Sequence, residues 1–255
     1  PHCRRMLLSV AVSILLLLLS STALHAAPQA LLRLDPGGHT SKVNKLAITP
    51  DGKLVTTSED KTIRIWNPKT GREERKILGQ LGPGGPEGRI YTIALSPDGK
   101  LLASGGYFMP EDVIRLHDFH SGELLQILKG HENVVNDLDF SPDGRWLASG
   151  SGDNTVRLWK RSGSRFTTGL VLRGHENDVY AVRLFEDGGR LRAVSASDDH
   201  TVRLWDAESG RQLALGRHED MVSSLAVGPD WIASTGSDKK IRIWDFSLRP
   251  LRTIR

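Results

Sequence analysis

The chain has 255 residues, of which 38% are hydrophobic and 25% are charged, a composition typical of a globular protein with one sizeable core. Its 34 basic and 30 acidic residues leave a formal net charge of only +4, which argues against the concentrated basic surface that nucleic-acid binding requires. The single cysteine, Cys3, precedes an apolar segment, so no disulfide or catalytic thiolate is expected after it.

Residues 4–27 differ from everything after them, because two arginines are followed by an apolar run and then by small residues that end in "TALHAA". This is the layout of a secretory signal peptide, so residues 1–27 are predicted to be removed, with cleavage after Ala26 or alternatively after Ala23 or Ala27. The mature domain, 28–255, is then exported to the periplasm or the outside. An uncleaved membrane anchor is the alternative, since the segment approaches the roughly 20 apolar residues of a spanning helix.

One ten-residue pattern recurs along the rest of the chain. It is written "TSEDKTIRIW" ending at Trp66, "GSGDNTVRLW" ending at Trp159, "ASDDHTVRLW" ending at Trp205 and "TGSDKKIRIW" ending at Trp244, with a degenerate copy, "EDVIRLH", ending at His117. His131, His175 and His218, which begin the later units, follow one another after 44 and 43 residues. Self-similarity at this period indicates stacked units, each unable to bury its apolar face alone.

Each unit contains three alternating runs and an apolar linking run, which predicts four short strands. "TPDGK" at 49, "SPDGK" at 96 and "SPDGR" at 141 place proline and glycine where hairpins close. Four strands at this period predict an all-β fold, a β-propeller of four-stranded antiparallel blades, and not a helical solenoid. The five units cover approximately residues 39–78, 79–129, 130–173, 174–216 and 217–255.

The Gly-His near the start of a unit and the Trp-Asp or its variant at the end make residues 30–255 resemble the WD-repeat (WD40) β-propeller family, in an exported bacterial-type form. The resemblance implies a hydrogen-bonded tetrad of His, Ser or Thr, Asp and Trp in each regular unit. The implied tetrads are His39, Thr56, Asp60 and Trp66; His131, Ser149, Asp153 and Trp159; His175, Ser195, Asp199 and Trp205; and His218, Ser234, Asp238 and Trp244. Unit two departs from this pattern: Pro86 replaces the His, His117 replaces the Trp, and Ser104 remains, with Glu111 or Asp112 near the turn.

These polar residues predict architecture and neither catalysis nor metal binding. A Ser-His-Asp triad occurs once, beside an oxyanion hole, whereas this set recurs in four units. The Gly-His histidines are spread one per blade, without paired His or Cys spacing, so no metal is expected. "GPGGPEG" at 82–88 lacks the Lys-Ser/Thr of a phosphate-binding loop. We therefore expect no enzyme activity and no cofactor.

Function is expected where the units differ. Partners of the resembling family commonly sit on the rim where the first strand of a unit begins and the Asp turn projects, which implies a protein or peptide partner there and neither nucleic acid nor, after signal removal, membrane. The variable rim residues are Lys42, Asn44, Glu59, Arg89, Tyr91, Val134, Asn136, Asp178, Tyr180, Asp198, Met221, Ser223 and Ser237. We expect Tyr91 and Tyr180 to be the anchors, because they occupy equivalent positions. The alternative is that the loops of any propeller are mixed in this way.

Strand counting predicts a fragment of a longer chain. Linking strands are expected at 30–39 and again at 249–255, which gives six for five three-strand sets, whereas a ring closed by its own ends needs equal numbers. The leading interpretation is an exported, non-catalytic scaffold for protein–protein interaction. One alternative is the regulatory or substrate-presenting propeller of a larger enzyme, such as a caspase-like peptidase or kinase fusion. Another is an enzyme with its site on the central axis, for which only Arg89 and Asp178 are candidates.

Overall fold

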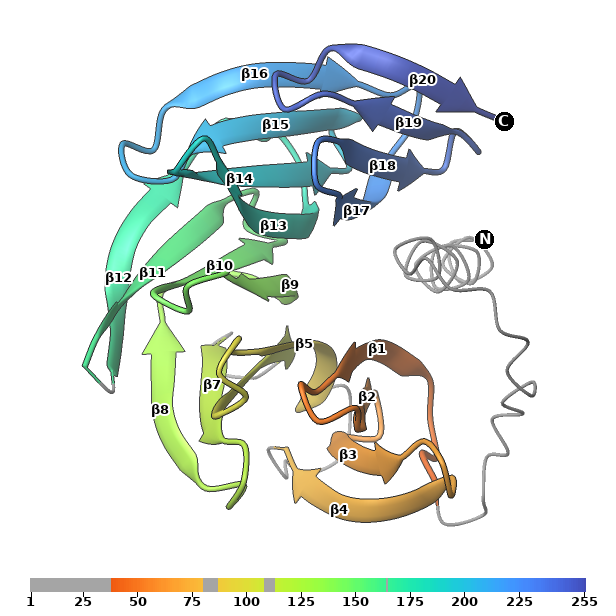
Figure 1. Cartoon of the computed structure of the whole chain (residues 1–255), viewed down its shortest axis with the longest axis vertical. Helices are drawn as coiled ribbons and strands as arrows, with labels where there is room; N and C mark the ends of the chain where they lie inside the picture. The colour runs from red at the N-terminus through yellow and green to blue at the C-terminus, as the bar shows by residue number, and fades with distance from the viewer. Residues whose placement is uncertain (1–37, 80–86, 108–112, 164) are drawn as a thin grey trace.

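The chain forms twenty β-strands in five sheets, as the computed structural model shows for residues 38–79, 87–107, 113–163 and 165–255 (Figure 1). Every sheet has four antiparallel strands that follow one another along the chain. The sheets stand side by side as blades around one axis, with the first strand of each blade innermost and the fourth outermost (Figure 1). The predicted all-β propeller of four-stranded blades is confirmed.

Each blade is a meander in which consecutive strands pair in order. Blade one holds β1 (Val43–Ile48), β2 (Leu54–Ser58), β3 (Thr62–Asn67) and β4 (Arg72–Leu78). Blade two holds β5 (Arg89–Leu95), β6 (Leu101–Tyr107), β7 (Val113–Asp118) and β8 (Leu124–Lys129). Blade three holds β9 (Val135–Phe140), β10 (Trp146–Ser151), β11 (Val156–Ser162) and β12 (Arg165–Leu172). Blade four holds β13 (Val179–Asp187), β14 (Arg190–Ser197), β15 (Thr201–Asp206) and β16 (Gln212–Arg217). Blade five holds β17 (Val222–Val227), β18 (Ile232–Gly236), β19 (Ile241–Trp244) and β20 (Pro250–Ile254). The outermost strand of each blade therefore comes from the predicted linking run.

The Pro-Asp-Gly turns close the first hairpin of blades one, two and three. In blade three, the Ser141 hydroxyl donates to Asp143 at 2.6 Å, and the N–H of Gly144 donates to the Ser141 carbonyl at 2.8 Å. Gly52, Gly99 and Gly144 have φ angles of 82°, 68° and 69°, a left-handed conformation that residues with a Cβ rarely adopt. Glycine thus stands at the turn position that needs it.

Apolar side chains between neighbouring blades form the core. Between blades two and three, Ile114, Leu116, Leu138, Leu147 and Phe166 lie in one cluster and are each no more than 2% exposed. Similar clusters lie between the other neighbouring pairs of blades. Because an inner blade buries both faces of its sheet against its neighbours, its stability depends on the blades beside it.

The arc of blades is open between blade five and β1, so the propeller is incomplete (Figure 1). Ile254 of β20 is 41% exposed, whereas Leu128 and Leu172, at the same position in blades two and three, are 4% and 2% exposed. The difference arises because a following blade covers Leu128 and Leu172. Ile254 of blade five is therefore left partly exposed, with no described blade over it.

The linking strand that we predicted at 249–255 is confirmed as β20. The signal peptide expected at 1–27, and most of the linking strand expected at 30–39, lie outside the described residues. Within the described ranges, no helix is long and apolar enough to span a membrane.

Candidate functional site

In blade four, the four tetrad residues form one hydrogen-bonded chain. His175 Nδ1 lies 2.8 Å from Asp199 Oδ2, and His175 Nε2 lies 2.7 Å from Ser195 Oγ. Trp205 Nε1 donates to Ser195 Oγ at 2.8 Å. Since a carboxylate only accepts, Nδ1 carries the imidazole proton and the serine hydroxyl donates to Nε2. The chain ties the loop before β13 to β14 and β15.

Three other blades repeat this arrangement with distances of 2.7–3.0 Å. The side chains joined are His39, Thr56, Asp60 and Trp66; His131, Ser149, Asp153 and Trp159; and His218, Ser234, Asp238 and Trp244. The structure thus brings together every residue of the four tetrads that the sequence implied.

Burial keeps two of the tetrad histidines neutral. It lowers the pKa of His175 and His218, against the pull of the neighbouring aspartates, so both imidazoles stay neutral. Burial alone would raise the pKa of Asp199, but hydrogen bonds from His175 and Thr201 outweigh it and the pKa is lowered. Ser195 is fully buried, so its hydroxyl is closed to a substrate. The arrangement stabilises a blade and does not provide an exposed nucleophile.

Blade two has a different arrangement. His117 takes the place of the tryptophan, and its Nδ1 lies 3.3 Å from the carbonyl oxygen of Gly122. Burial lowers the pKa of His117, so this imidazole is neutral as well. Ser104 is buried, whereas Pro86 and residues 111–112, named as its expected neighbours, lie outside the described residues.

The predicted rim residues lie where the first strands begin and the Asp turns close. The two loops of a blade are joined by backbone bonds, since Glu59 N donates to Lys42 O at 3.0 Å and Asp198 N donates to Asp178 O at 2.9 Å. The rim residues are Lys42, Asn44, Glu59, Arg89, Tyr91, Val134, Asn136, Asp178, Tyr180, Asp198, Met221, Ser223 and Ser237, and all thirteen are half-buried. The rim thus offers partly accessible, non-repeating side chains.

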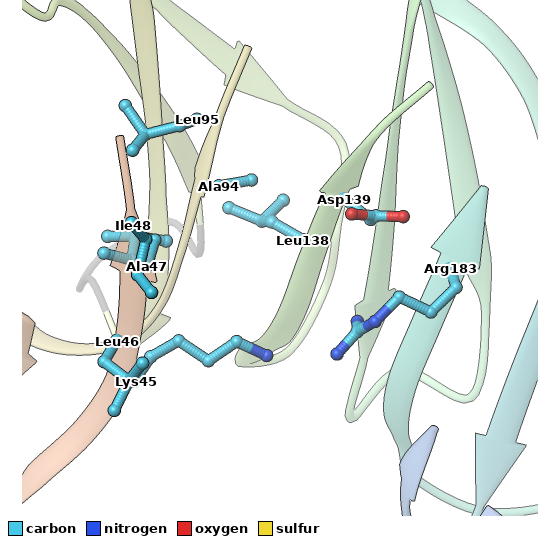
Figure 2. A pocket seen from close by; sticks show the side chains of 10 residues that line it. Lys45, Leu46, Ala47, Ile48, Ala94, Leu95, Leu138, Asp139 and Arg183 are labelled. Carbon is cyan, nitrogen blue, oxygen red and sulfur yellow. The ribbon is translucent and has the colours of Figure 1, made fainter. Parts of the chain in front are cut away.

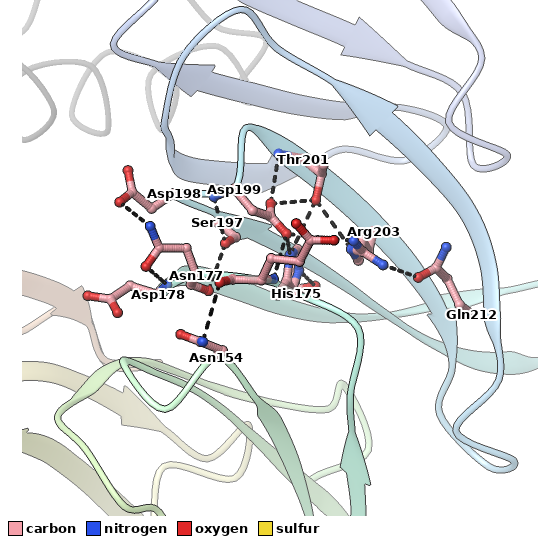
Figure 3. Close-up of polar contacts among 12 residues, drawn as sticks. Asn154, His175, Asn177, Asp178, Ser197, Asp198, Asp199, Thr201, Arg203 and Gln212 are labelled. Carbon is pink, nitrogen blue, oxygen red and sulfur yellow. Dashed lines mark hydrogen bonds and ion pairs between the residues drawn. The ribbon is translucent and has the colours of Figure 1, made fainter.

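Charge is unevenly distributed along this rim. On blade four, Asn177 Nδ2 donates to Asp198 Oδ2 at 2.9 Å (Figure 3). Burial and the charge of Asp198 raise the pKa of Asp178, and burial together with both carboxylates raises the pKa of Tyr180 to about 12. Tyr180 therefore keeps its phenolic proton beside an acidic patch.

Blades one and two form the other part of the rim. Arg89 Nη1 lies 3.2 Å from Glu59 Oε2, which links the two blades by an ion pair. Burial raises the pKa of Tyr91, so this phenol too stays protonated. Both predicted anchor tyrosines are half-buried, with part of each side chain accessible.

Two of the predicted rim residues also have a structural role that the sequence did not indicate. Asn44 Nδ2 donates to the carbonyl oxygen of Ile90 at 3.0 Å, and Asn136 Nδ2 donates to that of Val179 at 3.1 Å. Both acceptors lie on the inner strand of the next blade. The two amides therefore hold neighbouring blades together, so replacing them would disturb packing as well as any partner.

A second polar cluster lies on the inner strands, below the rim. Lys45 Nζ is 2.7 Å from Asp137 Oδ1, and Arg183 Nη1 is 2.5 Å from Asp137 Oδ2, so one carboxylate joins blades one, three and four. Thr92 and the backbone N–H of Val182 also donate to this carboxylate, at 3.2 Å and 3.1 Å. Burial would raise the pKa of Asp137, but the charges of Arg183 and Lys45 lower it to about 2.

Asp139 acts at the same junction. Its Oδ2 accepts the N–H of Leu184 at 2.7 Å, next to the bond from Val182 N to Asp137. β13 is an edge strand on the axis, so its inward N–H groups have no strand partner, and these two carboxylates satisfy them.

The two axial candidates that the sequence suggested, Arg89 and Asp178, do not line the pocket among the inner strands. The charged residues that line it are Lys45, Asp139 and Arg183, with Asp137 in contact with both cations. The sequence does mark the two aspartates as unusual. "VNDLDF" places Asp137 and Asp139 in a first strand at positions where the other units hold mostly alanine, serine or threonine. Within the described residues, no group of three His, Cys, Asp or Glu side chains could hold a metal ion.

The fold and the tetrads define a WD-repeat β-propeller protein. Family comparison agrees: the family described as "WD domain, G-beta repeat" matches residues 31–67, 76–112, 122–160, 166–206 and 211–245. The chain therefore belongs to the WD40 family.

Relatives of this chain include proteins of fungi and mammals. The nuclear distribution protein PAC1 of Arthroderma benhamiae is 37% identical over 53% of this chain and 32% of that protein. Apoptotic protease-activating factor 1 of Rattus norvegicus is 27% identical over 87% of this chain and 20% of that protein. A subunit of chromatin assembly factor 1 of Mus musculus is 32% identical over 48% of this chain and 25% of that protein. The chain thus spans a third or less of each, and these eukaryotic relatives do not support the bacterial-type qualifier.

A solved structure shares the architecture. U3-55K superposes with a TM-score of 0.74 and 27% sequence identity, over 86% of this chain and 65% of that chain.

Proposed function

We propose that this protein is a non-catalytic platform for protein–protein interaction, with the partner bound on the rim. One observation carries the proposal: four blades use their repeating polar side chains in internal tetrads, while the thirteen rim side chains, which vary among the blades, stay half-accessible around the strand starts. The names of relatives support it, since one of them is by its name a subunit of a chromatin assembly factor.

The rim also has the polarity to orient a partner. On blades one and two, Glu59 pairs with Arg89 and Lys42 adds one positive charge, whereas Asp178 and Asp198 on blade four are both acidic. Opposite charges at two ends of one surface select a partner of complementary polarity and increase its association rate. The regulatory propeller of a larger enzyme is not favoured as a second function, because no described contact is specific to it.

The experiment replaces both anchor tyrosines. A partner captured by the tagged chain is identified by mass spectrometry and purified, and its affinity is measured by calorimetry for the wild type and for the Tyr91→Ala/Tyr180→Ala variant. We expect at least about a tenfold loss, because buried aromatic anchors dominate interface energies. The matched control is Lys76→Ala/Arg165→Ala on the exposed outer strands, with affinity unchanged. Equal affinity for all three proteins at equal melting temperature refutes the rim as the binding surface.

Export of the protein is a separate proposal, supported by the signal-like residues 1–27 alone. Expression of the full chain and N-terminal sequencing of the product test it. A mature terminus near Pro28 supports export, and an intact terminus in the cell fraction contradicts it.

A further inference from the structure

The inner strands of blades one to four surround a pocket of about 230 Å³ below the rim. One wall is apolar and comes mainly from β1 and β5, with Leu46, Ile48 and Leu95. Lys45 and Arg183 extend toward each other across the pocket, and Asp139 lies on the Arg183 side (Figure 2). Since a water molecule occupies about 30 Å³ of liquid, the pocket has room for a small organic molecule.

The hydrogen-bond donors of this pocket's cations are only partly used. Asp137 is the one carboxylate in ion-pair contact with both Lys45 and Arg183 among the described residues. Arg183 makes its hydrogen bonds to Asp137 and to the Val182 carbonyl through Nη1. Its Nε and Nη2 make no hydrogen bond to any described residue and are not buried, so they face the open space. These two donors form the fork that binds a carboxylate in bidentate fashion.

The second carboxylate of the pocket is Asp139. Asp139 Oδ2 accepts the Leu184 N–H, and no described Lys, Arg or His nitrogen forms an ion pair with it. Burial, opposed by the charge of Arg183, raises the pKa of Asp139 to about 6. At neutral pH the carboxyl group is therefore mostly ionised, and burying this charge costs free energy. A cationic group beside Asp139 would remove that cost.

We propose that this pocket binds a small zwitterion, an α-amino acid with an apolar side chain. The ligand carboxylate lies on the Nε/Nη2 fork of Arg183 and near Lys45, the ammonium group lies on Asp139, and the side chain packs against Leu46 and Ile48. A simple carboxylic acid would place a second anion beside Asp139, and a simple amine would meet two cations. The proposal is independent of the rim and of its partner.

The test titrates the whole chain with L-leucine in a calorimeter, with isocaproate and isoamylamine as probes that each lack one charged group. We expect leucine to bind with a Kd of about 1 mM or lower and each single-charge probe at least about tenfold more weakly. Amide NMR spectra must show shifts at Ile48 and Leu184 on leucine addition, because Ile48 lines the pocket and the Leu184 N–H donates to Asp139. No heat from leucine with a well-dispersed spectrum, or equal affinity for the three probes, overturns the proposal.

A variant assigns the ammonium contact. Asp139→Asn keeps an oxygen for the Leu184 N–H, so it should fold, and it should reduce leucine affinity at least about tenfold. Asp230→Asn, an exposed residue away from the pocket, is the matched control and should bind as the wild type does. Unchanged leucine binding by a folded Asp139→Asn protein refutes the assignment. The Tyr91→Ala/Tyr180→Ala rim variant should bind leucine normally, which separates this site from the proposed partner surface.

Discussion

Ser195→Ala is expected to cost far more stability than removal of one hydroxyl usually does. The Ser195 hydroxyl satisfies two groups at once, the Trp205 indole N–H at 2.8 Å and His175 Nε2 at 2.7 Å. Trp205 is 1% exposed and His175 is 8% exposed, so water cannot replace the lost partner. A buried polar group without a partner costs about 1–3 kcal/mol, which gives about 2–6 kcal/mol for the pair. For a protein of this size, each kcal/mol lowers Tm by about 2–4 °C.

Calorimetry of Ser195→Ala and of Ser104→Ala measures this effect. Ser104 is equally buried, but its blade has a histidine in place of the tryptophan, and that histidine contacts a backbone carbonyl. We therefore expect Ser104→Ala to cost less than half as much. Equal losses in the two variants, or a loss below about 1 kcal/mol for Ser195→Ala, would refute the view that the tetrad binds the blade together.

Three further outcomes are expected. Asp137→Ala removes the carboxylate that joins two cations and should destabilise the fold by about 3–5 kcal/mol, as measured by urea unfolding; a loss near zero contradicts the network. His200 has a φ of 66°, so His200→Asn should raise stability by about 0.5–1 kcal/mol, and an unchanged Tm would show that the turn is not strained. Because burial lowers the pKa of His175 and His218, only the unfolded chain takes up their protons below about pH 6.5, and stability should fall as pH is lowered from there. His218→Gln should make that fall shallower, and an identical pH slope would contradict the assignment.

The architecture could be predicted because the same sequence pattern recurs in each unit. Each unit repeats the same period, the same turn residues and the same four tetrad positions, so an error in one copy is corrected by the others. Blade two shows the limit, since its His117 and the missing tetrad were visible in the sequence while the partner of His117, the Gly122 carbonyl, was not. Local patterns determine a strand and its turns. In a degenerate repeat, the hydrogen-bond partner of a buried polar side chain depends on which backbone group lies nearby, and the repeat pattern does not predict it.

The axial cluster could not be predicted from the repeats, because it belongs to no single repeat. Lys45 and Asp137 are 92 residues apart, and only the curvature of the arc brings them within 2.7 Å. Asn44 and Asn136 were assigned to the rim for the same reason: a side chain that reaches the next blade cannot be distinguished from one that reaches solvent without the angle between blades. Strand positions follow from sequence periodicity, and contacts between blades depend on their geometry.

The order of strands within a blade also has a consequence for how the chain folds. Every sheet is a meander of neighbouring segments, so the strand pairings within a blade join about forty consecutive residues, and its faces are covered only when the next blade follows. The bridge from Lys45 through Asp137 to Arg183 must wait until blade four is in place. These two ion pairs therefore form only after blades one, three and four have come together.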